Sequence, residues 1–429
     1  MIYNATIYND SWNTKKLYEL GDFSRGKSKH RPRNDPKLFD NGEYPLVQTG
    51  DIKAATLYVS KHEAAYNEFG LSQSKLWPTG TLCITIAANI AETGILAYPM
   101  CFPDSIVGFT ANQAETSEQF MHYIFTYIRQ SIQNSVSGSI QDNINIEYLK
   151  SLDFKIPEKS YQDKIVSVLS GLDEKIELNS KICSELEDMA KTLYDYWFVQ
   201  FDFPDENGKP YRTSGGEMIW NEQLKRKIPR GWNVTTINDM THSYRGVSYD
   251  KKYLLPTAEN GILVLRGNNI QNNRLVYDTN VAYVPCSLVS KEQQIRAHDI
   301  ILTMSSGSKD HIGKCTMFQY DSPHTYGAFL TKFTPDSDKV GFVYLSMISD
   351  FFKKKIQAIC NGTGINNLTN ETFDNLLFPK PGKTILGYFE EIVAPLFEKM
   401  GDCDRENEEL TKLRDWLLPM LMNGQARVE

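Results

Sequence analysis

The chain is organised around residues 161–200, which read YQDKIVSVLSGLDEKIELNSKICSELEDMAKTLYDYWFVQ. Their apolar side chains recur at steps of three and four residues with no intervening proline, which is typical of an amphipathic helix with a coiled-coil seam. The stripe consists of Ile165, Val168, Leu169, Leu172, Ile176, Ile182, Leu186, Met189, Leu193 and Trp197. At 1.5 Å per residue, roughly 40 residues span about 60 Å. A helix of this length is expected to separate other parts of the molecule.

Length and composition indicate a globular chain. The 429 residues suffice for two domains, and 41% hydrophobic residues can fill their cores. The first residues lack the basic start and apolar run of a signal peptide, and no 18 apolar residues occur in a row, so we expect a cytoplasmic protein without membrane spans. The seven cysteines show no zinc-site or disulfide spacing, so we interpret them as reduced packing residues. The net charge of -7 argues against a general basic surface that binds nucleic acid but allows local basic patches.

The two halves of the chain repeat one another. Trp12-Asn13 and Arg25-Gly26 recur 220 residues later as Trp232-Asn233 and Arg245-Gly246. Near the end of each half, seven identities recur at an offset of 224; they are Gly138, Asn143, Glu147, Leu152, Phe154, Pro157 and Lys159, matched by Gly362, Asn367, Glu371, Leu376, Phe378, Pro381 and Lys383. The middles match poorly, although Thr85 and Thr303 follow similar strand patterns. We infer that the two halves share one backbone framework and differ in the segments between its ends.

A second long helix is expected after Pro381. Its apolar stripe is Ile392, Leu396, Cys403, Leu410, Leu413, Leu417 and Met420, and Asn423-Gly424 is a typical helix stop. Pro395 and Pro419 should kink or break it. The two helices would most simply pair antiparallel, with a globular half at each end. Lys175 and Asn179 interrupt the first stripe; they either fix register or are merely solvated, and the sequence leaves both open.

The fold class is expected to be α+β, with two mixed domains that each precede a long helix. Strand-like runs occupy residues 44–47, 81–87, 106–110, 261–265, 300–304 and 331–334, and shorter helices occupy 118–133 and 340–359. Residues 201–231 are rich in Pro, Gly and charge and predict an extended connector. The expected boundaries are 1–158 and 232–382 for the two domains, 159–201 and 383–424 for the helices, and 202–231 for the connector.

Several catalytic motifs fail on context. Residues 21–28, GDFSRGKS, match the phosphate-loop pattern, but the following KHRPRNDP cannot start the helix such a loop requires. Pro103-Asp104 with Asp153 and Lys155 fits only a loose nuclease pattern. No adenine-methyltransferase, zincin or serine-hydrolase motif occurs. We expect no catalytic centre, no bound cofactor and no metal in this chain.

Basic and amide-rich loops occupy matching places in both halves. Arg and Lys bind phosphates or guanine edges, and Asn and Gln pair with adenine, so these loops are candidate DNA contacts. Any one of these residues could equally be an ordinary surface residue. In the first half the set is Arg25, Lys27, Lys29, Arg31, Arg33, Gln48, Thr49, Ser137, Ser139, Gln141 and Asn143, and in the second it is Arg245, Lys251, Arg266, Asn268, Asn269, Ser305, Ser306, Lys309, Asn366 and Asn367.

The residues around the first helix carry a family resemblance. The run LYDYWFVQFDFPDENGKPY at 193–211, with SGGEM at 214–218, IPRGW at 228–232 and LLPMLMNG at 417–424, resembles type I restriction-modification specificity subunits over the whole chain. The resemblance implies a non-catalytic subunit with two target-recognition domains, each reading half of a split, asymmetric DNA site. The middles of the halves match no known pattern, so base-contacting residues do not carry over.

The resemblance also implies a spacer and partners. Two antiparallel helices set the unread spacer, with Ile165, Leu172, Asn179, Leu186, Leu193, Leu396, Leu410, Leu413 and Leu417 at the helix contact. Partners would be double-stranded DNA, two methyltransferase subunits and two motor-nuclease subunits in a bacterial or archaeal cytoplasm. S-adenosylmethionine, ATP and Mg²⁺ would belong to those partners. Two alternatives stay open: a nucleotide-driven enzyme using residues 21–28, and a coiled-coil scaffold that never touches DNA.

Overall fold

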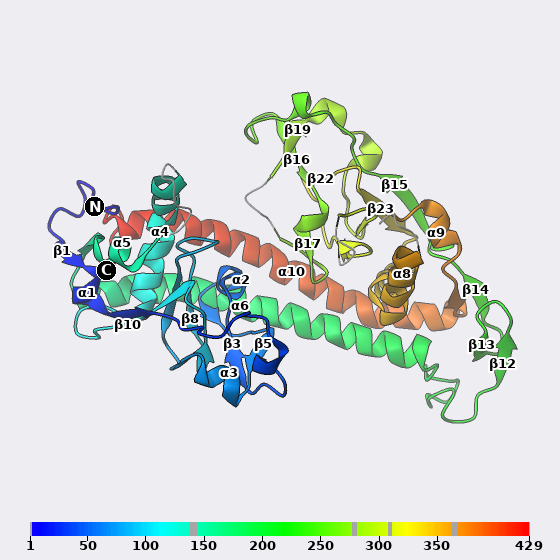
Figure 1. Cartoon of the computed structure of the whole chain (residues 1–429). Helices are drawn as coiled ribbons and strands as arrows, with labels where there is room; N and C mark the ends of the chain where they lie inside the picture. Colours follow the sequence, from blue (N-terminus) through cyan, green and yellow to red (C-terminus); the bar gives the residue numbers. More distant parts are fainter. Residues whose placement is uncertain (1, 138–143, 277–280, 308–310, 363–366, 429) are drawn as a thin grey trace. The chain divides into compact units, whose positions relative to one another are not determined.

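The computed structural model describes residues 2–137, 144–276, 281–307, 311–362 and 367–428 (Figure 1). The chain divides into two compact units: unit 1 is Met1–Asn179 with Glu406–Glu429, and unit 2 is Ser180–Arg405. Each long helix contributes residues to both units, so the units do not follow the chain order of the expected segments. The expected segment boundaries therefore stay a prediction.

Unit 1 contains a five-stranded sheet of order β2-β10-β7-β8-β4, a four-stranded sheet of order β5-β3-β9-β6, and the pair β1-β11. Its strands are β1 Asn13–Lys16, β2 Gly21–Arg25, β3 Tyr44–Leu46, β4 Tyr58–Val59, β5 Ala64–Tyr66, β6 Leu76–Trp77, β7 Leu82–Thr85, β8 Thr93–Leu96, β9 Met100–Cys101, β10 Ile106–Ala111 and β11 Asp153–Ile156. Its shorter helices are α1 Leu17–Leu20, η1 Pro36–Leu38, α2 Thr49–Ala54, α3 Glu68–Ser72, α4 Glu118–Ser137 and α5 Ile146–Lys150. Helix α4 is amphipathic, and its buried face joins Ile84, Phe109 and Phe154 in the main core.

Unit 2 contains a four-stranded sheet of order β15-β23-β20-β21, a three-stranded sheet of order β19-β16-β22, and three strand pairs. Its strands are β12 Met218–Asn221, β13 Arg226–Pro229, β14 Asn233–Thr235, β15 Thr241–Arg245, β16 Gly261–Leu265, β17 Ile270–Gln271, β18 Arg274–Leu275, β19 Tyr283–Pro285, β20 Ile300–Thr303, β21 Cys315–Met317, β22 Thr325–Tyr326, β23 Leu330–Pro335 and β24 Phe378–Lys380. Its shorter helices are η3 Asn238–Met240, η4 Lys251–Tyr253, η5 Gly267–Asn269, η6 Cys286–Leu288, η7 Lys291–Gln293, α7 Val340–Ile348, α8 Asp350–Gly362 and α9 Asn370–Asp374.

The repeat seen in the sequence is a repeat of strand register. Arg25 pairs with Val107 across β2 and β10, and Arg245 pairs with Thr331 across β15 and β23. Thr85 faces Ile106, just as Thr303 faces Leu330. Strands β1 and β11 pair in the register that β14 and β24 repeat. The two units are therefore built on one frame.

The long helices are α6 Lys159–Tyr194, continued by the π-helical turn η2 Asp195–Val199, and α10 Lys383–Met422. Helix α10 runs through Pro395 and Pro419 without the break that the sequence allowed. Within unit 1 the pairing is antiparallel, since Asp173 contacts Arg414 while Asn179 contacts Glu406 (Figure 1). Within unit 2, Cys183 contacts the carbonyl of Met400, and Trp197 packs on Phe389, so the same antiparallel sense continues.

The buried face of the helices differs from the predicted stripe. Met189 is 58% exposed and Val168 is 36% exposed, so both face solvent. On α10, Ile392 and Leu413 also face solvent, at 46% and 43%. The centre of the α6 face is instead occupied by residues that include Asp173, Asn179, Cys183, Glu187 and Ala190. The centre of the contact between α6 and α10 therefore includes polar residues that have partners. Because the apolar pattern does not contain these residues, it located only one side of that contact.

The spacer residues named from the sequence lie at different depths. Ile165 and Asn179 are buried, Leu413 is exposed, and the others are half-buried beside the seam; these are Leu172, Leu186, Leu193, Leu396, Leu410 and Leu417. Asn179 donates from Nδ2 to Glu406 Oε2 at 2.7 Å and to Asn407 Oδ1 at 3.0 Å. Lys175 joins the same Glu406 at 3.2 Å. Asn179 is paired inside the seam and Lys175 at its edge, so the register reading is favoured over simple solvation.

Two further expectations need correction. The connector at 201–231 is not simply extended, because β12 and β13 form an antiparallel hairpin within it. The expected helix at 340–359 is two helices, because Ser349 adopts an extended backbone and its hydroxyl accepts from the amide of Phe352 at the start of α8. The cysteines are free and six are buried as packing residues, as expected, but Cys286 is exposed, so the packing role is wrong for that residue.

Candidate nucleic-acid interface

The candidate site in unit 1 begins at the end of edge strand β2. Arg25 is the last residue of that strand, and the amide of Gly26 donates to the carbonyl of Ile106 at 2.8 Å. A Cβ on Gly26 would lie 2.3 Å from the carbonyl oxygen of Pro103, so only glycine allows this close approach. The Arg-Gly step therefore fixes where the exposed Arg25 side chain leaves the sheet. In the described residues, the Arg25 guanidinium has no hydrogen-bond or ion-pair partner.

A basic loop follows Gly26. Lys27 and Lys29 are exposed, and their ammonium groups have no partner among the described residues. Arg33 forms an ion pair of 2.6 Å with Asp104, which Arg31 approaches at 3.7 Å. These pairs hold the loop in place without neutralising it, because Arg31 and Arg33 share one carboxylate while Lys27 and Lys29 have none among the described residues. Cations that folding leaves unpaired are available to phosphates.

His30 and Asp35 brace the same loop. His30 Nε2 lies 2.8 Å from the Asp35 carboxylate, and this hydrogen bond is the main cause that holds the pKa of Asp35 below its ordinary value. The amide of Lys37 also donates to Asp35, which caps the short helix η1. After β2 the described chain forms this irregular loop up to η1, so GDFSRGKS is not followed directly by the helix that a phosphate-binding loop requires. That the chain binds no nucleotide stays a prediction.

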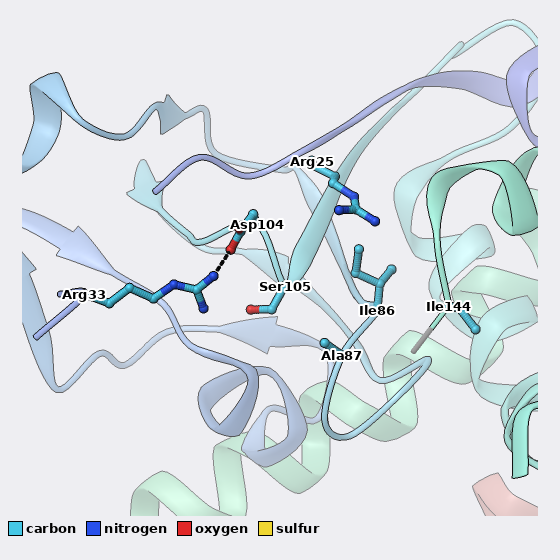
Figure 2. Close-up of a pocket in the computed structure, with 7 residues that line it drawn as sticks. All are labelled: Arg25, Arg33, Ile86, Ala87, Asp104, Ser105 and Ile144. Carbon is cyan, nitrogen blue, oxygen red and sulfur yellow. Dashed lines mark hydrogen bonds and ion pairs between the residues drawn. The ribbon is translucent and has the colours of Figure 1, made fainter. Parts of the chain in front are cut away.

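Arg25 and Arg33 line a pocket of about 210 Å³ with Ile86, Ala87, Asp104, Ser105 and Ile144 (Figure 2). Figure 2 shows Asp104 joined to Arg33 and Ser105 beside them, with Arg25 on the other side of the pocket. Backbone hydrogen bonds tie the walls together, since Ile86 N donates to Ser105 O at 2.9 Å and Ile144 N to Ile86 O at 3.0 Å. The pocket thus gathers four segments of the sequence, at residues 25–33, 86–87, 104–105 and 144.

Unit 2 places the same segments in the same way. The amide of Gly246 donates to Leu330 O at 3.1 Å, and its Cβ position lies 2.2 Å from the carbonyl oxygen of Gly327. Met304 N donates to Phe329 O at 2.9 Å, and Leu368 N to Met304 O at 2.8 Å. These bonds are the counterparts of those that join Ile86, Ser105 and Ile144 in unit 1. Arg245 therefore occupies the position of Arg25.

The chemistry at these matched positions differs. Ala328 and Phe329 stand where unit 1 has Asp104 and Ser105, and Arg245 donates from Nε to the carbonyl of Ala328 at 3.3 Å. The Ser305 hydroxyl donates to the Asn367 side chain, which joins two of the predicted loops. The frame is common to both units, but the groups it presents are not.

Other predicted residues lie at varied places. Gln48 is exposed, and Thr49 is the first residue of α2; the described contacts do not connect either to the basic loop. In unit 2, Arg266 donates to Tyr249 at 3.2 Å, while Asn268 and Lys251 are exposed. Asn269 is 6% exposed and bonds the amide of Arg266 and the carbonyl of Val276, so its side chain supports the loop.

Part of the predicted set cannot be placed. Ser139, Gln141, Asn143, Lys309 and Asn366 lie outside the described residues, as does the side chain of Ser137. Ser306 takes part in an interaction within the molecule. The sequence reading missed Asp104, Ser105 and Phe329 as parts of these sites. Applying the 224-residue offset of the repeat to β10 and β23 matches Ser105 with Phe329, so the repeat could have identified these two positions.

The loose nuclease pattern is accounted for by structural contacts. Asp104 pairs with Arg33, Asp153 pairs with Lys16 at 3.0 Å, and Lys155 donates to the carbonyls of Asp10 and Trp12. In the described part of the chain, no cluster of three or more His, Cys, Asp or Glu side chains is placed to hold a metal ion. Across the same residues, no helix is long and apolar enough to cross a bilayer.

Each unit ties its globular part to the helices by polar contacts. In unit 1, Tyr123 of α4 donates to Asp173 of α6 at 2.7 Å, and Arg414 of α10 binds the other oxygen of that carboxylate at 2.9 Å. Asp173 is 2% exposed. In unit 2, the β17–β18 hairpin supplies Asn273, which donates to Glu187 at 2.6 Å, and Arg274, which binds Asp404 at 3.2 Å. We call these two groups the unit 1 anchor and the unit 2 anchor.

Comparisons with known proteins agree with this architecture. The family model described as type I restriction modification DNA specificity domain matches residues 9–188 and 229–394. The MjaIX specificity subunit of Methanocaldococcus jannaschii is 24% identical, covering 97% of this chain and 94% of that protein. The HindI specificity subunit of Haemophilus influenzae is 26% identical, covering 72% and 75%.

A solved structure shares the fold. The specificity subunit of a type I restriction-modification system from M. genitalium superposes with a TM-score of 0.55 at 17% identity, covering 98% of this chain and 99% of that one. The duplicated family match spans both units, and the MjaIX relative aligns over nearly the full length of both chains. The chain therefore belongs to the family of type I restriction-modification DNA specificity subunits.

Proposed function

We propose that this chain reads a bipartite, asymmetric DNA site, one half-site with each recognition domain. The observation that carries the proposal is the matched pair Arg25 and Arg245, each set at the end of an edge strand by the same register and followed by a glycine packed on backbone. Two copies of one frame each present an arginine at a matched strand end. Charged edges of this kind engage phosphates and guanine edges.

The two half-sites differ in sequence because the surfaces differ in chemistry. Unit 1 presents a cluster of cations around one carboxylate, whereas unit 2 presents one arginine, an exposed aromatic ring and a hydroxyl-amide pair. Direct readout depends on which donors, acceptors and apolar groups meet the base edges. A shared frame with different groups therefore supports an asymmetric site.

The long helices act as a ruler in this proposal. Recognition domains at 1–158 and 232–382 attach to them through the two anchors, so the distance between the half-sites depends on helix length. The paired Asn179 opposes sliding of α6 along α10, because a shift would leave its amide unpaired. A stiff separation makes the spacer between half-sites a fixed property of the protein.

The chain is proposed to assemble two methyltransferase subunits for adenine-N6 methylation and two motor-nuclease subunits for cleavage of unmodified DNA. Those partners would bind S-adenosylmethionine, ATP and Mg²⁺. Exposed apolar side chains on the helices are the first places to look for methyltransferase contacts; they include Trp416 at 63% and Val199 at 40% exposure. Trp197 is only 5% exposed and packs in the core, so it is not such a contact.

Methylation mapping tests the proposal most directly. DNA from host cells with and without this chain is sequenced for N6-methyladenine, and we expect one split motif to lose methylation when the chain is absent. Purified complex should bind that motif with an affinity that falls steeply with salt. Unchanged methylation in the absence of the chain would refute the proposal, as would purified complex that ignores DNA at low salt. The second result would favour the scaffold alternative.

A matched insertion tests the ruler. Inserting residues after Leu186 of α6 alone would part Cys183 from Glu187, which belong to one buried face of unit 2. Seven residues inserted after Asn179 and seven after Arg405 leave both units intact and turn the helix by nearly two whole turns. The added length of about 10 Å should lengthen the methylated motif's spacer by about 3 base pairs. A folded double insertion that methylates the original motif would contradict the ruler.

A further inference from the structure

The turn that precedes β23 holds an aromatic ring out of the protein. Phe329 is 67% exposed, more than Trp416 at 63%. Its backbone is nevertheless fixed, since its carbonyl accepts from Met304 N at 2.9 Å and from Ser305 N at 3.3 Å. Leu330 N closes the turn onto Gly327 O at 2.8 Å. The ring is therefore displayed from a rigid position rather than from a loose loop.

The neighbours of Phe329 are polar groups of the candidate interface. Arg245 donates to the carbonyl of the preceding residue, Ala328, at 3.3 Å. Ser305, whose amide bonds Phe329, is itself bonded through its hydroxyl to Asn367. An apolar ring thus stands among an arginine, a serine and an asparagine. Each of these three was a predicted DNA contact.

The matched position in unit 1 holds Ser105. Its carbonyl accepts from Ile86 N at 2.9 Å, the bond that Met304 makes to Phe329, and Ser105 lines the pocket beside Arg25 and Arg33. The frame therefore delivers a small polar group in one unit and a large apolar group in the other. A different side chain at a matched, exposed position would give the two recognition domains different DNA sequence preferences on the same scaffold.

The chemistry of the ring selects one kind of contact. Phe329 offers no donor or acceptor for a phosphate or for the polar edges of bases. In the major groove, the apolar group that the bases present is the C5 methyl of thymine. A ring held on a fixed backbone loses little conformational freedom on binding, so its burial against a methyl group is retained as affinity.

We propose that Phe329 reads a thymine in the half-site of unit 2 by packing against its C5 methyl group in the major groove. This inference rests on the proposed function, since it names one residue's part in that DNA recognition. Arg245 beside it supplies the positive charge that brings the backbone of the duplex close. Insertion of the ring between base pairs is the competing geometry, and the test separates the two.

The test uses the assembled complex of this chain with its methyltransferase partner and duplexes carrying the mapped motif. Each thymine of the two half-sites is replaced in turn by deoxyuridine, which lacks the C5 methyl. Wild type should lose about fourfold in affinity at one thymine, the effect of one buried methyl group. F329A should bind the thymine duplex about 30-fold more weakly and should not respond to deoxyuridine there.

Controls keep the outcomes distinct. F351A removes another ring of unit 2, 41% exposed on α8 and packed near Phe378, and should bind like wild type. Thermal unfolding of F329A and F351A checks that each variant folds, and both should unfold cooperatively. The inference is overturned if F329A binds like wild type, if every deoxyuridine duplex binds normally, or if the half-site of unit 2 has no A·T pair. Weak F329A binding with silent deoxyuridine indicates ring insertion, whereas a wild-type complex without sequence preference removes the proposed function itself.

Discussion

The two units share strand register almost residue for residue and differ at the positions that this register exposes. Arg25 and Arg245 occupy one place, but the residues beside them are Asp104 and Ser105 in unit 1 and Ala328 and Phe329 in unit 2. Backbone hydrogen bonds and glycines maintain the frame, while side chains at turns carry the variation. A fold of this kind can change what it binds without changing how it folds.

The anchors extend the comparison to stability and give the largest expected effect. Asp173 is 2% exposed, so D173A leaves Arg414 and Tyr123 without their shared carboxylate and should cost about 4 kcal/mol of unfolding free energy. In the unit 2 anchor the side chains of Arg274 and Asp404 are 30% and 42% exposed, so D404A should cost about 0–1 kcal/mol. Urea unfolding followed at both units measures the difference. Equal costs would show that the anchors are equivalent.

Buried His122 makes unit 1 sensitive to acid. Desolvation, with the charges of Arg129 and Arg414, lowers its pKa from 6.5 to about 3. The unfolded chain therefore binds the proton more readily, and the stability present above about pH 6.5 is lost as the pH falls toward 3. Between pH 7 and pH 4 this loss should be on the order of 3 kcal/mol.

The matched control for this effect is in the same chain. H122Q should flatten the acid dependence of unit 1, measured as wild type minus variant in unfolding experiments at each pH. Ser346 stands 224 residues after His122, is also buried and carries no titrating group, so S346A should leave the acid dependence unchanged. An H122Q curve parallel to that of wild type would show that the imidazole does not contribute.

The arginine pair gives the smallest effect. R25Q removes a side chain without a partner among the described residues, so binding should weaken about fivefold and the salt slope should fall by about 1, with the motif unchanged. R245Q removes a guanidinium held by Ala328 O, and it should relax the preference at one base pair of its half-site. Binding to a panel of single-base variants at several salt concentrations separates the two results. The prediction would be wrong if R25Q changed the base preference and R245Q changed only the affinity and its salt dependence.

Much of the frame was predictable because periodicity and repetition survive in the sequence. The strand at 261–265 was placed at its observed bounds, and the first long helix was expected at 161–200 against Lys159–Tyr194 followed by Asp195–Val199. The orientation of the seam was less predictable. Asp173 and Glu187 are buried only because partners from other elements satisfy them, and no local pattern reveals those partners.

The candidate sites were likewise predictable in part: repeated residues were found, and residues placed only by the tertiary fold were missed. Arg25 and Arg245 were found because the Arg-Gly step repeats, and the glycines turned out to be sterically required. Asp104 and Phe329 were missed, since a Pro-Asp turn and a single aromatic look ordinary until hydrogen bonds place them beside the arginines. Asn269 shows the opposite case, because its polarity suggests a contact while its burial serves the loop.

The polar centre of the α6 seam also bears on how the protein is made. Helix α6 ends at Tyr194 and α10 begins at Lys383, so the ribosome adds 189 further residues before a partner for the seam exists. At 5–20 residues per second, this interval lasts roughly 10 to 40 s. If the stripe of α6 were purely apolar, the α6 helices of neighbouring nascent chains on one mRNA could pair with each other. Asp173 and Glu187 would then meet like charges from a second copy, so the seam waits for the one helix that carries Arg414.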